Sequence, residues 1–288
     1  MKKSKLAKVL TVSLAALMVF GLASCGGGSG KVSDKDITVI SREEGSGTRD
    51  AFTELTGVLQ DDVDKTVDTA EISNSTSVVT QSVAGNDAAI GYISLGSLDD
   101  TVKAVKVDGV EATVDNIKSG DYKIQRPFNI VTKGEVKELP ADFIKFIMSK
   151  DGQKIIEDEG YISVNDNAGA YKASGLKGSI TLAGSTSVSP VMEVLADKYK
   201  ELNSGVTIEI QQTGSGAGIQ STTEGVCDIG MASRELKDEE TSQGLKSEEI
   251  ALDGIAVIVN KDNGVEDLSM DQIMKIFTGE ITSWADVK

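Results

Sequence analysis

The chain has 288 residues, with 29 Lys and Arg against 45 Asp and Glu, so its formal net charge at pH 7 is −16. Such an acidic chain is a poor partner for nucleic acid, and any anion that it binds must be held by local groups against the overall field. The sequence contains no histidine, which excludes Ser-His-Asp catalysis and histidine-based metal sites.

The N-terminus predicts export followed by attachment to a lipid. Residues 1–8 hold four lysines and no acid, and the almost wholly apolar Val9–Leu22 is too short for a comfortable membrane span. The next residues, up to Cys25, resemble the lipobox of bacterial lipoproteins, in which the cysteine is lipidated and becomes the new N-terminus. An ordinary signal peptide with an incidental Cys25 is the alternative. We therefore predict a signal peptide over residues 1–24 and a lipid anchor with a flexible tether over residues 25–31.

The processed chain is expected to be more acidic and free of disulfides. Removal of residues 1–24 takes away four lysines and no acid, so the net charge falls from −16 to −20. With Cys25 lipidated, Cys227 has no cysteine to pair with inside the chain. We expect Cys227 to be a small buried hydrophobic residue.

Short β-rich runs alternate with helical patterns along the rest of the chain, which predicts an α/β architecture with mostly parallel strand pairing. By composition alone, the polar and turn-rich Asn165–Lys177 would mark a domain boundary. The predicted strands are 37–40, 89–93, 128–132, 179–183, 206–210, 228–232 and 255–259; the predicted helices are 49–55, 78–84, 141–148 and 152–158 (one helix or two), a helix carrying Met192, Leu195 and Tyr199, 219–224 and 270–277.

Three loops rich in glycine and hydroxyl groups each follow a predicted strand and open a predicted helix. Glycine lets backbone N–H groups approach a ligand, and a helix N-terminus adds free N–H groups with partial positive charge. One such loop alone is more simply a turn with an N-cap, whereas three in one chain favour an oxyanion site. Arg42 adds a planar set of charged donors three residues before the first loop. The loops are Gly45–Thr48, Gly184–Ser187 and Gly214–Gly218.

Neither GxGxxG nor GxxxxGK[ST] occurs in the sequence, which disfavours dinucleotide and P-loop sites. The segment Ile37–Phe52 instead resembles the hallmark segment of phosphate-binding proteins of high-affinity phosphate ABC importers. Ser179–Pro190 is similar to the opening segment of that family. The resemblance implies a type II periplasmic-binding-protein fold, with two α/β lobes joined by a hinge and an anion held between them. Further matching segments are Ala89–Ser94, Gly214–Ile219, Asp228–Arg234, Leu252–Asn260 and Ile276–Trp284.

The order of the matching segments differs from that of the family. There, the segment similar to Ser179–Lys288 comes first and the one similar to Val32–Val164 follows, so this chain resembles a circular permutation. An engineered rearrangement or a misassembled gene would give the same order. The resemblance implies one continuous lobe over residues 126–252 and a second over residues 32–125 plus 253–288. Asn165–Lys177 would then lie inside a lobe, as the loop that joins the former termini.

The resemblance also implies a ligand set. One lobe supplies Arg42, Ser46, Gly47 and Thr48, and the other supplies Thr186, Ser187, Ser215 and Ser233. Some family members carry an aspartate where Ser233 stands, which accepts the proton that phosphate carries and sulfate lacks, and others carry serine. Ser233 can accept a hydrogen bond but does not repel a fully ionised anion.

The implied function is an extracytoplasmic lipoprotein on the outer face of the cell membrane that captures inorganic phosphate and delivers it to the permease subunits of an ABC importer. It is expected to be a monomer that touches the membrane only through its lipid, with no cofactor, metal, catalytic residue or nucleic-acid partner. A binding protein for another oxyanion, such as sulfate, molybdate or arsenate, is the alternative.

Two further hypotheses are less well supported. An enzyme such as a phosphatase needs a metal cluster or an activated nucleophile. The acids are instead spread along the chain, in runs such as Asp61–Asp64 and Lys237–Glu240 that are typical of solvated surface. A permuted product that folds poorly is the other hypothesis, and the intact loops at every ligand position argue against it.

Overall fold

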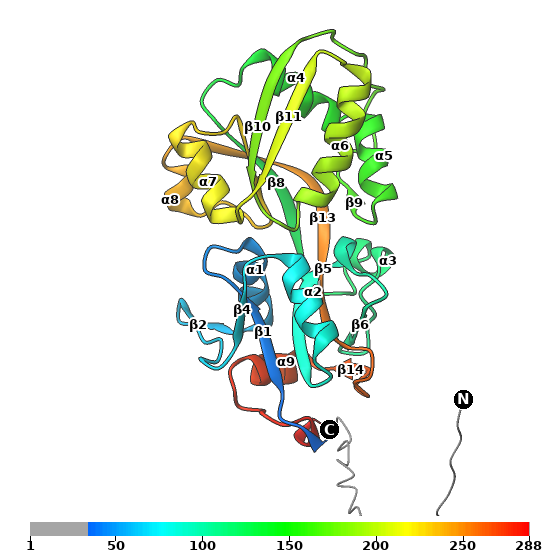
Figure 1. Ribbon diagram of the computed structural model, residues 1–288, viewed down its shortest axis with the longest axis vertical. Coiled ribbons are helices and arrows are strands. Elements are labelled where there is room, and N and C mark those ends of the chain that lie inside the picture. The colour runs from blue at the N-terminus through cyan, green and yellow to red at the C-terminus, as the bar shows by residue number, and fades with distance from the viewer. Residues whose placement is uncertain (1–33, 288) are drawn as a thin grey trace, which may run out of the picture. The chain divides into compact units, whose positions relative to one another are not determined.

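The computed structural model describes residues 34–287, which fall in one compact unit. The predicted signal peptide, Cys25 and the tether lie outside the described residues. Two separate groups of buried apolar side chains form two α/β lobes (Figure 1). None of the helices within 34–287 is long and apolar enough to cross a membrane.

The first lobe has parallel strands at its centre, because β1 pairs with β4 on one side and with β5 on the other. Its core includes Phe52, which stacks on Tyr92 with ring centroids 3.9 Å apart and meets Phe277 edge-on. The elements of this lobe are β1 (Thr38–Arg42), α1 (Gly47–Thr56), β2 (Leu59–Gln60), β3 (Val63–Asp64), β4 (Glu71–Ser73), α2 (Thr76–Gly85), β5 (Ala89–Ser94), η2 (Leu95–Ser97), β6 (Val102–Ala104), β7 (Lys106–Val107), α3 (Val114–Lys118), β14 (Asp267–Leu268), α9 (Met270–Phe277) and η3 (Trp284–Asp286).

The second lobe also has a parallel centre, in which β10 lies between β11 and β12. Tyr199 packs against Phe143 and Phe146 in its core. The elements of this lobe are α4 (Glu138–Ile147), α5 (Lys150–Asp158), β9 (Ile162–Ser163), β10 (Gly178–Gly184), α6 (Ser189–Leu202), β11 (Val206–Gln212), α7 (Ser215–Glu224), β12 (Ile229–Ala232) and α8 (Asp238–Thr241).

Two long antiparallel strands, β8 (Gln125–Lys133) and β13 (Leu245–Asn260), connect the lobes (Figure 1). Their ladder ends at the pair of Gln125 with Gly254, and from Ile255 onward β13 pairs with β5 of the first lobe. The main path of the sheet is therefore β11-β10-β12-β8-β13-β5-β1-β4. The predicted lobe boundaries, between residues 125 and 126 and between 252 and 253, stay a prediction. They place Ile162 and Leu252 in the second lobe, but both residues pack with the core of the first lobe.

The expectation of mostly parallel pairing is wrong. Parallel ladders occur within each lobe, but the middle of the sheet is antiparallel, since β8 pairs with β12 and β13, and β13 pairs with β5. The first half of β13 was also missed. It contains Lys246, Glu248 and Glu249, and this charged stretch does not look like a strand until β8 provides a partner.

The other predicted elements are present with shifted ends. Residues 141–158 form two helices, and the hydroxyl of Ser149 caps the second by accepting the N–H of Gly152. Helix α7 begins at Ser215 rather than at the predicted Ile219, so most of the third glycine loop is the first turn of a helix. Cys227 is buried, as expected.

The turn-rich segment 165–177 lies against the second lobe and is not a linker between the lobes. Asn165 donates its side-chain amide to the carbonyl of Met148, and the N–H of Tyr171 bonds to the Asp151 carboxylate. Farther on, the amide oxygen of Asn203 accepts the N–H of Gly175. The segment therefore has its hydrogen-bond partners on helices of this lobe, so the boundary suggested by composition is wrong.

Gly218 allows α7 to lie directly on β10, and this generates a prediction for stability. A Cβ atom on Gly218 would lie 2.4 Å from the carbonyl oxygen of Ala183 and 2.4 Å from Cα of Gly184, both backbone atoms. We expect Gly218→Ala to lower the free energy of unfolding by ~1–3 kcal/mol. The clash outweighs the gain of ~1 kcal/mol in helix propensity.

Chemical denaturation of Gly218→Ala checks this expectation, and Gly85→Ala is its control. Gly85 is the last residue of α2, and its added Cβ would meet no atom within 4 Å. The control should therefore be neutral or slightly stabilising. Equal stability of the two variants would show that the close packing of α7 on β10 is not a constraint.

Candidate functional site

Each of the three glycine loops leaves a strand and enters a helix, and the three meet where the lobes face each other. They join β1 to α1, β10 to α6 and β11 to α7. Between the first and third loops, the N–H of Gly216 donates to the carbonyl of Gly45 at 2.9 Å. The helices therefore begin at the seam between the lobes and direct their N-terminal groups toward it.

Glycine at position 47 lets the two lobes come this close. A Cβ atom on Gly47 would lie 2.4 Å from Ser215 Oγ and 2.8 Å from Ser233 Oγ, both in the second lobe. Real Cβ contacts are essentially never this short, so a side chain at this position would force the two serine hydroxyls or the lobes to move. The pattern of glycine beside hydroxyl residues thus reflects a close approach of backbone to side chains.

A cluster of buried hydroxyl groups fills the seam, and we call it the hydroxyl cluster. Thr48 Oγ1 lies 3.0 Å from Ser187 Oγ across the seam. Within the second lobe, Ser185 donates to Ser233 at 3.0 Å, and Ser215 Oγ lies 3.3 Å from Ser233 Oγ. The members of the cluster are Thr48, Thr76, Ser185, Thr186, Ser187, Ser215 and Ser233, all buried.

Arg42 brings a positive charge to this cluster and is only 2% exposed. Its Nη2 atom donates to Thr186 Oγ1 of the other lobe at 3.1 Å. The same guanidinium forms a two-point ion pair with Glu43, through Nε and Nη2 at 2.8 Å each. Arg49 supports the backbone here by donating to the carbonyl of Arg42 at 2.8 Å. The Arg42 guanidinium is thus held at the seam, and its edge formed by Nε and Nη2 is already paired with Glu43.

The structure brings together seven of the eight predicted ligand residues, and Ser46 lies directly beside them. The hydroxyl of Ser46 caps α1 by accepting the N–H of Arg49 at 3.4 Å. Sequence reasoning missed Ser185, although it stands in the second glycine loop. It also missed Thr76, which opens α2 after a serine-rich turn that contains no glycine. The only sequence signal for Thr76 is this hydroxyl-rich turn after a strand.

A buried ion pair lies next to the cluster, where β8 and β13 connect the lobes. Arg126 bonds to Asp253 through Nη2 at 3.1 Å and donates through Nη1 to the carbonyl of Ser233 at 3.2 Å. Ser94 donates to the other carboxylate oxygen at 2.9 Å. Burial raises the pKa of Asp253 to about 6, although Arg126 acts to lower it. The pair ties the start of β8 and the middle of β13 to the wall of the hydroxyl cluster.

Arg234 joins the lobes at the edge of the seam. Its guanidinium pairs with both carboxylate oxygens of Glu240 at 2.8 Å, and its Nε lies 2.9 Å from Asp50 of the first lobe. Burial raises the pKa of Glu240, but hydrogen bonds and charge from Arg234 outweigh this and leave that pKa below its ordinary value.

The expectation that the acidic runs are solvated surface is therefore only partly correct. Glu240, in the run Lys237–Glu240, is 13% exposed and holds Arg234. Asp64, at the end of the run Asp61–Asp64, accepts a hydrogen bond from Arg49 at 2.7 Å. Each run thus ends in a carboxylate that positions an arginine near the seam.

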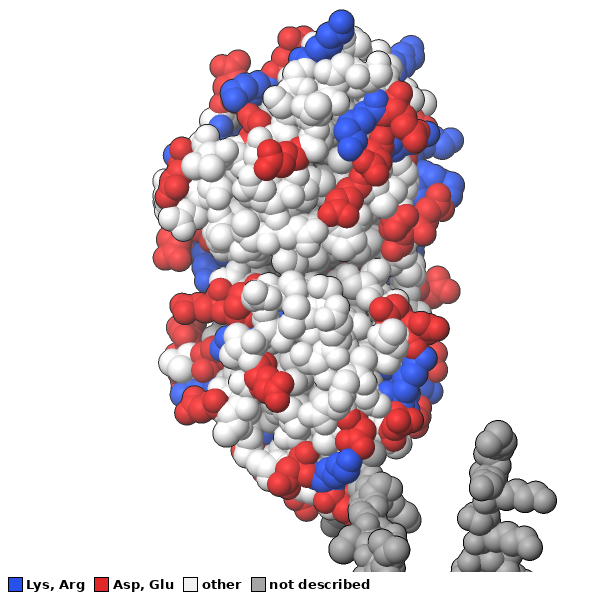
Figure 2. Space-filling model, viewed as in Figure 1, with Lys and Arg blue, Asp and Glu red and all other residues white. Residues whose placement is uncertain are grey.

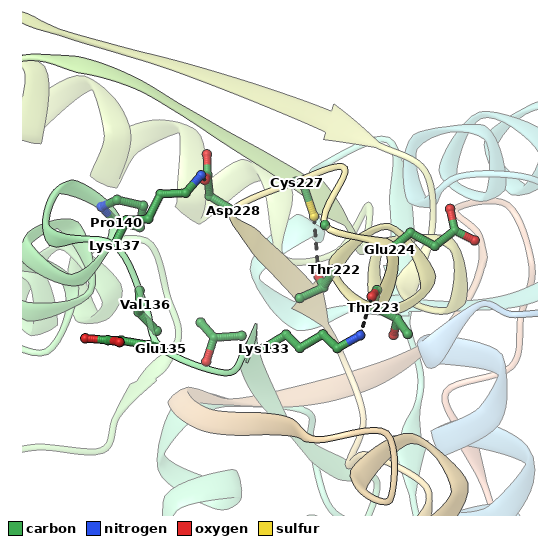
Figure 3. Close-up of a pocket in the computed structure, with 12 residues that line it drawn as sticks. Lys133, Glu135, Val136, Lys137, Pro140, Thr222, Thr223, Glu224, Cys227 and Asp228 are labelled. Carbon is green, nitrogen blue, oxygen red and sulfur yellow. Dashed lines mark hydrogen bonds and ion pairs between the residues drawn. The ribbon is translucent and has the colours of Figure 1, made fainter.

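A cavity of about 380 Å³ lies elsewhere on the second lobe and contains none of the predicted ligand residues (Figure 3). Two of the lysines that line it are already bonded, Lys137 to Asp228 at 2.9 Å and Lys133 to the carbonyl of Thr223 at 2.6 Å. Burial raises the pKa of the nearby Cys227 thiol, which makes it less reactive. This cavity therefore lacks the buried, available donors that the seam provides.

Metal binding has no support within the described part of the chain, where no group of three or more Cys, Asp or Glu side chains is placed to hold an ion. The donors at the seam are hydroxyl, amide and guanidinium groups, which bind anions rather than cations. The arrangement can therefore surround a small oxyanion with donors from both lobes.

Comparison with known proteins gives the same picture. The family model described as "PBP superfamily domain" matches residues 28–151 and 169–288. The "Phosphate-binding protein PstS 2" of Streptococcus agalactiae is 52% identical over 294 residues, spanning 100% of this chain and 99% of that protein. The "Phosphate-binding protein PstS" of Bacillus subtilis is 38% identical over 128 residues, but this covers only 43% of this chain and 42% of that protein.

A solved structure agrees over most of the chain. It is a phosphate-binding protein of a phosphate ABC transporter from Streptococcus pneumoniae, with a TM-score of 0.72 and 49% sequence identity, covering 88% of this chain and 100% of that chain. With matches to both sequence and fold over most of its length, this chain belongs to the PstS family of phosphate-binding proteins, within the periplasmic-binding-protein (PBP) superfamily.

Proposed function

We propose that this chain binds inorganic phosphate between its two lobes and delivers it to an ABC importer. The observation that carries the proposal is the buried set of donors at the seam, in which hydroxyls of the two lobes bond to each other and Thr186 accepts a hydrogen bond from the Arg42 guanidinium. Family membership supports the same ligand, because the full-length relative from S. agalactiae is named a phosphate-binding protein. The ligand residues proposed are Arg42, Ser46, Gly47, Thr48, Thr186, Ser187, Ser215 and Ser233.

Neutral donors suit this task in an acidic protein. Hydroxyls and helix-start N–H groups stabilise an anion through local dipoles, which act strongly where water is excluded. Only Arg42 adds a full charge within the cluster, and Glu43 offsets part of it. The site can then bind an anion without the excess of positive charge that would make release slow.

Closure of the lobes is the proposed means of capture. The hydrogen bonds that cross the seam include those from Arg42 to Thr186, between Thr48 and Ser187, and from Gly216 to Gly45. They can form only when the lobes approach, and β8 and β13 are the connections about which the lobes would rotate. The Arg234–Asp50 pair adds an attraction at the edge of the closed form.

The remaining parts of the proposal concern the location, partners and oligomeric state of the protein. Membership of an importer's binding-protein family supports an extracytoplasmic location and permease subunits as partners. We further propose a monomer that is anchored to the outer face of the cell membrane through lipidated Cys25. The family consists of binding proteins, so the chain is not an enzyme, and the phosphatase hypothesis is set aside.

We also propose that the permuted order is natural. The S. agalactiae relative matches along the whole chain, whereas the B. subtilis relative matches less than half of either sequence, as a rearranged order would produce. In the structure, the two ends of the first lobe lie together, since Ile37 N–H donates to the carbonyl of Thr282 and Trp284 N–H to that of Lys35. Adjacent ends are what a circular permutation requires.

Calorimetric titration of residues 26–288, stripped of bound anion, tests the proposed function. We expect one-site binding of phosphate, with weaker binding of sulfate. Ser233→Asp should increase this discrimination, because a carboxylate repels fully ionised sulfate but accepts the proton of phosphate. Binding of sulfate as tightly as phosphate, or no binding by a chain that melts cooperatively, would contradict the assignment.

Loss of the buried charge gives a second prediction. We expect Arg42→Met to weaken phosphate binding by ~30-fold or more, because a desolvated charged donor is lost and Glu43 is left without its partner. The control is Lys154→Met, which changes the net charge equally but removes a side chain that is 65% exposed and paired with Asp158 within α5. Equal losses in both variants, measured by the same titration, would mean that overall charge rather than the placement of Arg42 determines affinity.

A further inference from the structure

Thr76 belongs to the hydroxyl cluster but is not part of the proposed ligand set. It is the first residue of α2, after the N-cap Ser75, and is 4% exposed. Its Oγ1 lies 3.2 Å from Thr186 Oγ1 and 3.1 Å from Ser187 Oγ, both in the other lobe. Its N–H also donates to Thr186 Oγ1, at 3.3 Å. Thr76 thus meets the second lobe at the same atoms as Arg42 and Thr48.

The hydrogen bonds around Thr186 give the hydroxyls of the cluster a direction. Thr186 Oγ1 accepts hydrogens from Arg42 Nη2 and from the N–H of Thr76. A hydroxyl oxygen has two lone pairs, so Thr186 must direct its own hydrogen to another acceptor, and Thr76 Oγ1 is in place to take it. Thr76 can then donate onward to Ser187. Its hydroxyl hydrogen is therefore available for donation at the centre of the cluster.

Thr76 also lines a cleft at the seam. This cleft has a volume of about 470 Å³ and is lined by Thr76 and Thr186, with Asp99 as its only charged side chain. Helices α2 and α6 contribute to its walls, and the surface where they face each other is uncharged in the middle of the seam (Figures 1 and 2). Thr76 and Thr186 are the members of the hydroxyl cluster that line this cleft, so an anion entering here reaches them before the rest of the cluster.

A second cleft at the seam is less suitable as an entrance for an anion. It has a volume of about 490 Å³, and Asp50, Glu54, Asp64 and Glu235 are among the residues that line it. Arg126, Arg234 and Lys237 line it as well, so its formal charge does not distinguish it from the other cleft. None of the members of the hydroxyl cluster lines it, so an anion in this cleft does not meet the cluster.

We infer that Thr76 is a further anion-contacting residue of this site, whose hydroxyl donates to one oxygen of the bound tetrahedral anion. The inference rests on the proposed function. It assigns to α2 a direct part in binding, so that four helix starts rather than three surround the anion. It also predicts that the contribution of Thr76 depends on the ligand having an oxygen to receive the hydrogen.

The test compares phosphate with phosphite, which lacks one oxygen, in calorimetric titrations of residues 26–288. We expect Thr76→Val to weaken phosphate binding by ~10- to 100-fold, while Thr76→Ser stays within ~3-fold of the wild type. Phosphite can turn its hydrogen toward position 76, so its binding should change by less than ~3-fold in Thr76→Val. The matched control is Thr80→Val, which removes a hydroxyl that bonds only to the carbonyl of Thr76 within the same helix.

The possible results separate this inference from the proposed function. Absence of phosphate binding by the wild-type chain would overturn both. Phosphate binding that Thr76→Val leaves within ~3-fold of the wild type would overturn the inference alone. An equal loss for phosphate and phosphite would also overturn it, because Thr76 would then only position Thr186. Should Thr76→Val fail to melt cooperatively, Thr76→Ala takes its place under the same criteria.

Discussion

A buried guanidinium at the seam is the constraint on which the rest of the structure depends. Arg42 is 2% exposed, and a charge so far from water is tolerated only when partners satisfy its donors. Glu43 takes one edge, and Thr186 of the other lobe takes another hydrogen. This second bond fixes how near the lobes must come. Glycine at position 47 fits the same close approach, because a side chain there would displace the hydroxyls of Ser215 and Ser233 or move the lobes apart.

Hydroxyl groups suit the seam because they can form hydrogen bonds whether or not an anion is present. A hydroxyl donates one hydrogen and accepts two, so Thr48 and Ser187 can satisfy each other or turn their hydrogens toward a ligand. A lysine in the same place could only donate, and its charge would need a buried partner. Neutral donors from helix starts thus allow binding that is firm but reversible, which is what transfer to an importer requires.

The parts of this arrangement that could be predicted from the sequence are local ones. A glycine–hydroxyl loop between a strand and a helix involves only residues that are close together in the sequence. The loops at Gly45, Gly184 and Gly214 could therefore be identified from the sequence. The roles of Thr76 and Arg126 could not, because both depend on residues more than a hundred positions away in the chain. The first half of β13 could not be predicted for the same reason, because its charged stretch becomes a strand only beside β8.

The same locality is compatible with the proposed change of order, because each part of the proposed site is built from one short stretch of chain. Each donor group belongs to one strand–loop–helix unit, and none of these units contains the proposed new join or the present chain ends. The join, residues 165–177, is bonded to helices of the second lobe. At the present ends, Lys35 and Ile37 bond to Trp284 and Thr282, so the first lobe is closed by hydrogen bonds where the unpermuted order would continue the backbone. The backbone passes between the lobes through β8 and β13, and neither strand contains the proposed join or the residues near the chain ends. A permutation confined to such places alters the order of folding contacts more than the geometry of binding.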